Sequence, residues 1–111
     1  MGADYELPQA LKLRLNKLGY TDEKITEKIG EYSEEARVYI GLELEGFELK
    51  EEETVLLRNN YVQYKLFADV EMESLVEDKR IFIRELIVNI KKNKLRLQNE
   101  EREKAKRTKV F

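Results

Sequence analysis

The longest stretch of helical periodicity in the chain runs from Ser74 to about Leu97. Ser74 and Glu77 have the S-x-x-E spacing of a capping box, which predicts the start of a helix at Ser74. The apolar positions fall on one face of that helix, and they are Val76, Ile83, Ile87, Ile90 and Leu97, with Phe82 and Leu86 widening the stripe. Because so wide a stripe needs neighbours on two sides, we predict that this is the central helix of the fold.

Two helices are predicted before it. Leu7, Leu11, Leu15 and Leu18 form a stripe, and Gly19 stands where a C-terminal cap requires a left-handed residue, so the first helix should run from Leu7 or Pro8 to Gly19. A second helix should begin at Thr21 or Asp22 and end at Gly41, with a possible break at Gly30. Its apolar face consists of Ile25, Ile29, Tyr32, Ala36, Tyr39 and Ile40.

Alternation of apolar and acidic residues marks the segment from Leu42 to Glu53. The pattern suits a short strand or hairpin, but we favour an acidic loop, with its last carboxylates beside the start of the next helix. That third helix should span about Glu52 to Val70 and pair antiparallel with the fourth through the connector Asp69–Glu73. The acidic segment comprises Glu43, Glu45, Glu48, Glu51, Glu52 and Glu53.

Basic residues follow the fourth predicted helix. Lys91, Lys92, Lys94 and Arg96 either complement the helix dipole and end the helix or serve in binding, and the segment from about residue 99 onward reads as an extended charged arm. We therefore predict an all-α fold of about four helices, with a helical domain at 1–98 and a basic C-terminal arm at 99–111.

The distribution of charge along the chain supports the division into a helical domain and a C-terminal arm. The chain has 21 basic and 23 acidic side chains, for a net charge of −2. Residues 1–90 carry 12 basic and 20 acidic groups, net −8, whereas residues 91–111 carry 9 basic and 3 acidic groups, net +6. The protein is thus expected to combine an acidic body with a basic tail.

The sequence lacks the residues that most active sites use. It has no Cys and no His, and Ser33 and Ser74 therefore have no histidine to activate them. Asp69, Glu71 and Glu73 resemble the start of a calcium loop, but Arg80 occupies the position of its bidentate glutamate. We expect no enzyme activity, no metal site and no cofactor, and the absence of long apolar runs predicts no secretion signal and no membrane contact.

Two possibilities for nucleic-acid binding arise. Residues 21–40 read as a helix-turn-helix with Gly30 in the turn, although the recognition helix would open with Glu34 and Glu35, leaving Arg37 to attract phosphate. The basic tail could also contact nucleic acid without sequence preference, or dock on an acidic protein surface, and the pattern is compatible with both. A helical adaptor for another protein is a further interpretation.

The order of helices resembles the small head-tail connector, or head-completion, proteins of tailed bacteriophages. The matching pieces are LNKLGYTD (15–22), EARVYIG (35–41), VLLRNNYVQYKLF (55–67) and FIRELIVNI (82–90), and the resemblance covers about residues 7–97.

This resemblance implies a structural, all-helical subunit that forms a homo-oligomeric ring, typically of twelve copies, in the neck of the virion below the portal protein. The ring would be assembled in the host cytoplasm, extend the channel through which DNA passes as non-specific cargo, and provide a platform for the stopper or tail-completion protein. The acidic segment would line the lumen or meet a neighbour. The arm would reach a neighbour or the portal through Arg102, Lys106, Arg107, Lys109, Val110 and Phe111.

Overall fold

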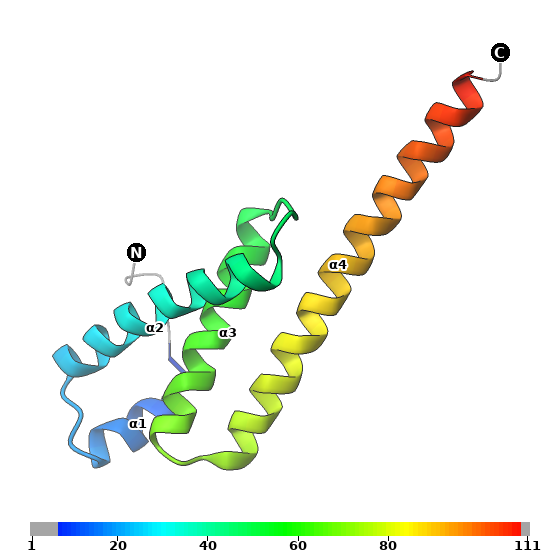
Figure 1. Cartoon of the computed structure of the whole chain (residues 1–111). Coiled ribbons are helices and arrows are strands. Elements are labelled where there is room, and N and C mark those ends of the chain that lie inside the picture. Colours follow the sequence, from blue (N-terminus) through cyan, green and yellow to red (C-terminus); the bar gives the residue numbers. More distant parts are fainter. Residues whose placement is uncertain (1–6, 110–111) are drawn as a thin grey trace.

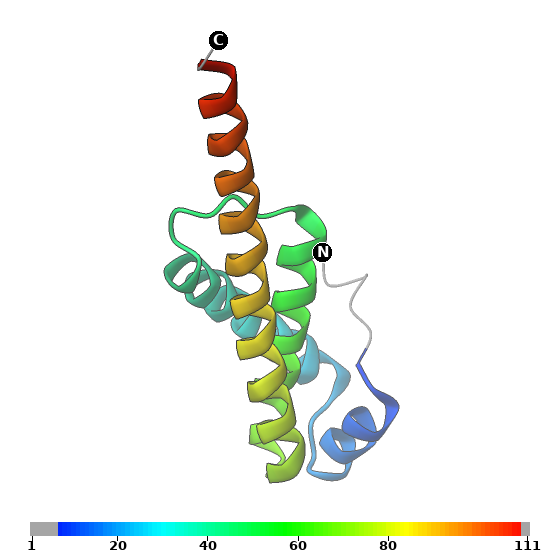
Figure 2. The same ribbon diagram turned by 90° about the vertical axis from the view of Figure 1, so that its right-hand side faces the viewer.

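The computed structural model describes residues 7–109, and within them it contains four helices and no strand. The helices are α1 (Gln9–Lys17), α2 (Asp22–Glu43), α3 (Glu51–Asp69) and α4 (Glu73–Lys109). The molecule is elongated, 70 × 28 × 21 Å, because α4 runs far beyond the other helices (Figures 1 and 2). The all-α expectation is confirmed.

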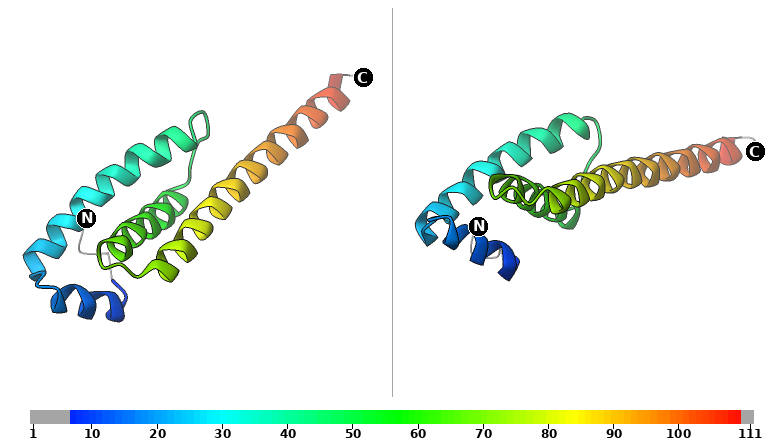
Figure 3. Two further views of the ribbon diagram at one scale, coloured as in Figure 1. Left: turned by 60° about the horizontal axis from the view of Figure 1, so that its bottom comes forward. Right: turned by 90° about the horizontal axis from the view of Figure 1, so that it is seen from below.

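The middle position belongs to α3 rather than to α4. The two principal helix–helix interfaces are those of α3 with α2 and of α3 with α4, and α3 and α4 run antiparallel as predicted (Figures 1 and 3). The prediction of a central fourth helix was therefore wrong. The buried surface of α3 is wide because α2 covers that helix on one side and α4 covers it on another.

The core consists of two clusters. The first joins α1 to the N-terminal half of α2 and to the C-terminal half of α3. Its buried members are Leu11, Leu15, Ile25, Tyr32, Val62, Leu66, Phe67 and Val70. The second joins α2, α3 and α4, and its buried members are Ala36, Ile40, Leu44, Leu57, Ile83, Ile87 and Ile90. Residues from α4 pack on both clusters, since Leu75 and Val76 lie against the first. Burial of these side chains is the main force that holds the helices together.

A hydrogen bond between side chains also links α2 to α3. The hydroxyl of Tyr32 donates a hydrogen bond of 2.5 Å to the carboxylate of Asp69. Burial is the main cause that raises the pKa of Tyr32, and the neighbouring carboxylate adds to it. The ammonium groups of Lys28 and Lys65 each lie 5.6 Å from the centre of the Tyr32 ring. Tyr32 is thus held both by apolar packing and by its polar end.

Helix ends follow local rules in most places. Gly19 has φ +93°, and the amide of Tyr20 donates to the carbonyl of Leu15 at 3.0 Å, as in a Schellman cap. The side chain of Thr21 caps α2 by accepting from the amide of Lys24 at 3.1 Å. Both predictions are confirmed.

Other predicted boundaries were wrong. Gly30 lies inside α2 without a break, and α2 continues past Gly41 to Glu43, so the turn falls instead at Gly46, with φ +85°. Packing of the α2 face against α3 stabilises the helix across both glycines, which outweighs their low helix propensity.

The start of α4 also differs from the prediction. The helix begins at Glu73, where the amides of Leu75 and Val76 both donate to the carbonyl of Met72 at 3.0 Å. The Glu77 carboxylate accepts from Arg80 at 3.0 Å instead of closing a capping box with Ser74. The short connection between α3 and α4 contains Glu71, which has φ 57°. This left-handed conformation is common in the residue that follows the end of a helix.

The C-terminal arm is a continuation of α4, which runs to Lys109 instead of ending near Leu97. The prediction of an extended arm was therefore wrong for the described residues. No Gly or Pro follows Leu97 in the sequence, and an existing helix lengthens without a second nucleation step. Glu100 and Lys104 add a favourable i,i+4 spacing, with the carboxylate on the N-terminal side.

Candidate interaction surfaces

The predicted acidic loop is divided between a loop and two helix ends. Glu43 is the last residue of α2, and Glu45 and Glu48 lie in the connection between α2 and α3. Glu51, Glu52 and Glu53 form the first turn of α3, where carboxylates are stabilised by the helix dipole. The prediction of one continuous acidic loop up to Glu53 was thus wrong, although five of these six side chains are exposed as a charged surface requires.

Glu53 is the exception, because it is engaged within the chain. Its carboxylate accepts a hydrogen bond of 2.9 Å from the amide of Lys50 and lies 3.0 Å from the ammonium group of Lys94 on α4. The backbone hydrogen bond from Lys50 is the main cause that lowers the pKa of Glu53, and Lys94 lowers it further. The acidic segment and the basic cluster of one molecule therefore meet at this ion pair.

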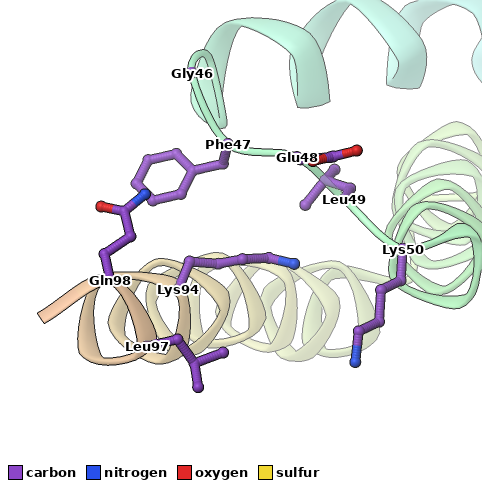
Figure 4. Close-up of a pocket in the computed structure, with 8 residues that line it drawn as sticks. All are labelled: Gly46, Phe47, Glu48, Leu49, Lys50, Lys94, Leu97 and Gln98. Carbon is purple, nitrogen blue, oxygen red and sulfur yellow. The ribbon is translucent and has the colours of Figure 1, made fainter. Parts of the chain in front are cut away.

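An open hollow of about 640 Å³ lies beside this ion pair, between the α2–α3 connection and α4 (Figure 4). Phe47 reaches from the connection towards Gln98, and Leu97 and Lys94 form the α4 side (Figure 4). The complete lining is Gly46, Phe47, Glu48, Leu49, Lys50, Lys94, Leu97 and Gln98. The hollow lies where α4 leaves the bundle (Figure 4).

Replacing Glu53 by glutamine should lower the free energy of unfolding by about 1 kcal/mol near pH 7, the usual worth of a partly buried charge-assisted hydrogen bond. The folded-state pKa of Glu53 lies below the ordinary value of 4.5. The ionised carboxylate therefore contributes its stability above that value, and the contribution is lost as the pH falls through the folded-state pKa. Urea denaturation should show a difference between wild type and variant at about pH 7 that shrinks as the pH falls below the ordinary value of 4.5 and through the lowered pKa of Glu53.

The control for this experiment is Glu52→Gln in the same turn, where the carboxylate is exposed. Its effect should be smaller than that of Glu53→Gln at every pH. Equal losses from the two variants would mean that the helix dipole, rather than the contacts with Lys50 and Lys94, stabilises the charge at Glu53.

The predicted binding residues of the arm are only partly described. Arg102 is exposed on α4, in the part of the helix that stands clear of the bundle (Figure 2). Lys106, Arg107 and Lys109 continue the helix, but their side chains lie outside the described residues, as do Val110 and Phe111. The described part of the arm is therefore a solvated helix face.

A cluster of tyrosines was not predicted as a site. The rings of Tyr39 and Tyr61 lie 5.2 Å apart and those of Tyr61 and Tyr64 lie 6.0 Å apart, measured between centroids. They line a small depression with Lys65, Arg80 and Ile83. Burial is the main cause that raises the pKa of both Tyr39 and Tyr61. Helical periodicity places these tyrosines on inward faces of α2 and α3, but their meeting depends on how the two helices cross.

Residues 21–40 do not form a helix-turn-helix. They lie in the N-cap and body of the single helix α2, and the guanidinium of Arg37 donates to the carboxylate of Glu34 at 3.0 Å. A recognition helix requires a turn near Gly30 that would redirect the chain, and the cation expected to attract phosphate is paired with an acid. Residues 22–43 therefore lack the turn that a helix-turn-helix requires.

Comparison of the chain with protein-family models, with curated proteins and with solved structures gives no match.

Among residues 7–109, no group of three or more acidic side chains is arranged to hold a metal ion. No helix in the same range combines the length and the apolar character needed to cross a membrane.

Proposed function

We propose that this protein is a structural head-tail connector subunit of a tailed bacteriophage or prophage. Copies would form a ring, of twelve subunits as the family resemblance implies, in the virion neck between the portal protein and the stopper or tail-completion protein. The ring would extend the DNA channel, with DNA as non-specific cargo, and would assemble in the host cytoplasm.

The observation that carries this proposal is the asymmetric build of the subunit. An acidic, compact bundle holds one end of α4, and the basic remainder of that helix stands clear of it as a single helical rod (Figure 1). A free helix of this length is marginal in water unless something covers it, so the rod is well suited to dock on another surface. Opposite charges at the two ends of one subunit favour contacts between unlike faces, which build a ring where the rotation between neighbours closes.

In this proposal, the acidic residues outside the Glu53–Lys94 ion pair face either the lumen of the ring or a neighbouring subunit. Glu43, Glu45, Glu48, Glu51 and Glu52 are exposed in one region at the α2–α3 connection. Facing the lumen, they would repel the DNA backbone and keep it from adhering. Facing a neighbour, they would attract its basic arm.

Electron microscopy of the purified chain, with and without purified portal rings, tests the proposal. We expect rings with a central hole, either free or stacked on the portal, and co-sedimentation of the two proteins. Monomers that neither assemble nor bind portal rings would contradict it. Tight, sequence-selective binding to short duplex DNA that depends on Arg37 would also contradict it and would favour a regulator of transcription.

A further inference from the structure

The outer face of α2, opposite its buried residues, carries apolar side chains that the chain itself does not cover. Val38 is 52% exposed and Leu42 is 71% exposed, and they are neighbours at spacing i,i+4 on this face. The buried residues of the helix, such as Ala36 and Ile40, point the other way, towards α3. Towards its N-terminal end the same face becomes acidic, with exposed side chains at Glu27, Glu31 and Glu34.

Gly41 lies between Val38 and Leu42 on this face, and the fold gives no internal reason for a glycine there. A Cβ atom built at Gly41 would meet no atom within 4 Å, and the residue has ordinary helical geometry. Glycine weakens a helix interior relative to alanine. A glycine flanked by exposed apolar residues is instead useful where the backbone of another helix approaches closely.

The outer side of α4 presents a matching stripe. Ile81, Val88 and Leu95 are 44%, 43% and 50% exposed, and their spacing of seven residues aligns them along one side of the helix. Ile83, Ile87 and Ile90, which are buried, occupy the opposite side. The stripe is therefore directed away from α3.

Charge distinguishes the two faces. The sequence of α2 carries seven acidic and three basic residues, net −4, whereas that of α4 carries seven acidic and twelve basic residues, net +5. Around Val88, three of the four residues one helical turn away are basic, namely Arg84, Lys91 and Lys92, with Glu85 as the fourth. Two copies of α2 would repel each other, as would two parallel copies of α4, but α2 and α4 attract.

The two faces also lie on opposite sides of the molecule. In the ribbon views α3 stands between α2 and α4, and the outer sides of α2 and α4 point away from one another (Figures 1 and 3). One copy can therefore engage two neighbours at the same time. A contact between unlike faces that repeats in this way builds a ring or a filament.

We infer that the outer face of α2, centred on Val38, Gly41 and Leu42, binds the Ile81–Val88–Leu95 stripe of α4 in a second copy of this chain. The inference rests on the proposed self-assembly and adds which surfaces of the subunit meet. Gly41 allows the two helices to approach closely, Val38 and Leu42 bury against the stripe, and the opposite charges select this pairing over like-with-like pairing.

A mixing experiment tests this head-to-tail arrangement. One variant, Val38→Glu with Leu42→Glu, blocks the α2 face, and a second, Val88→Glu, blocks the α4 stripe. Each alone should stay monomeric by light scattering at concentrations where the wild type assembles. Mixed in equal amounts, they retain one intact pair of faces and should form a heterodimer that does not grow further.

Variants at glycine positions test the α2 face without lowering the stability of the fold. Gly41→Gln should raise the melting temperature, because it removes a helix-interior glycine into open space, yet weaken association at least tenfold. Gly30→Gln also lies in open space on an exposed part of α2 and should raise the melting temperature in the same way. Leu13→Glu, which alters an exposed leucine of α1, should leave association unchanged. Raising the salt concentration should weaken wild-type association, since the charges become screened.

The outcomes separate this inference from the proposed function. If the wild type forms rings and both blocked variants form them equally well, or if the mixture stays monomeric, the assignment of faces is overturned while the ring stands. If the wild type forms open filaments that both variants abolish, the faces are supported and the ring is overturned. A wild type that stays monomeric with portal rings present overturns both.

Discussion

Replacing Leu57 by alanine should lower the free energy of unfolding by roughly 3 kcal/mol, as expected for truncation of a fully buried leucine. Leu57 is 0% exposed and lies on α3 in the cluster that also contains Ile40 of α2 and Ile87 of α4. The resulting cavity would loosen both principal interfaces of the bundle at once. Because domains of this size are stable by about 5–15 kcal/mol, the loss should be plain in urea denaturation followed by circular dichroism.

Leu56→Ala is the matched control, since Leu56 precedes Leu57 in the same helix but is 44% exposed. Its effect should stay within about 0.5 kcal/mol, as is usual for surface positions. If the two variants lost equal stability, α3 would not occupy the middle of the bundle in solution.

A chain that stops at Gln98 should keep its fold but lose most of its capacity to bind portal rings, by roughly an order of magnitude in affinity. The last core residue of α4 is Ile90, and Leu97 is already 51% exposed, so the removed part contributes little to the bundle. The removed part carries a net positive charge and, as the end of a rigid helix, is well placed to contact another protein. Circular dichroism tests whether the shortened chain keeps its fold, and co-sedimentation with portal rings tests whether it still binds them.

A full-length variant with Lys106, Arg107 and Lys109 changed to glutamine separates charge from length. It keeps good helix-forming residues and removes three cations. Loss of binding in this variant would assign the contact to charge, whereas retained binding would assign it to the remaining surface of the arm. Undiminished binding of portal rings by the chain ending at Gln98 would show that the arm is dispensable, without affecting the assignment of the α2 and α4 faces.

The tertiary structure changes the meaning of the charge separation seen in the sequence. Opposite charges at the two ends suggest attraction between different molecules, but Glu53 and Lys94 satisfy each other within one chain. The carboxylates left for a neighbour are those of the exposed acidic residues near the α2–α3 connection and along the outer side of α2. Intramolecular pairing of this kind depends on the fold of α3 against α4 and has no signature in local sequence.

Local sequence determined which segments are helical and where some of them end. Apolar spacing marked many of the buried positions, although Leu18, Phe82 and Leu97 belong to the same predicted stripes and are 50%, 43% and 51% exposed. The left-handed position at Gly19 and the cap at Thr21 follow from short-range steric and hydrogen-bonding rules. Such features depend on residues within one or two turns of each other, so no knowledge of the rest of the chain is needed to predict them.

Tertiary structure decided the features that depend on distant residues. It placed α3 rather than α4 in the middle, carried α2 across Gly30 and Gly41, and left Val38, Leu42 and Val88 uncovered although they are as apolar as core residues. Periodicity shows that a residue lies on a given helix face, but whether another helix covers that face is set by how the helices cross. The exposed apolar faces to which we assign assembly therefore became apparent only in the folded chain.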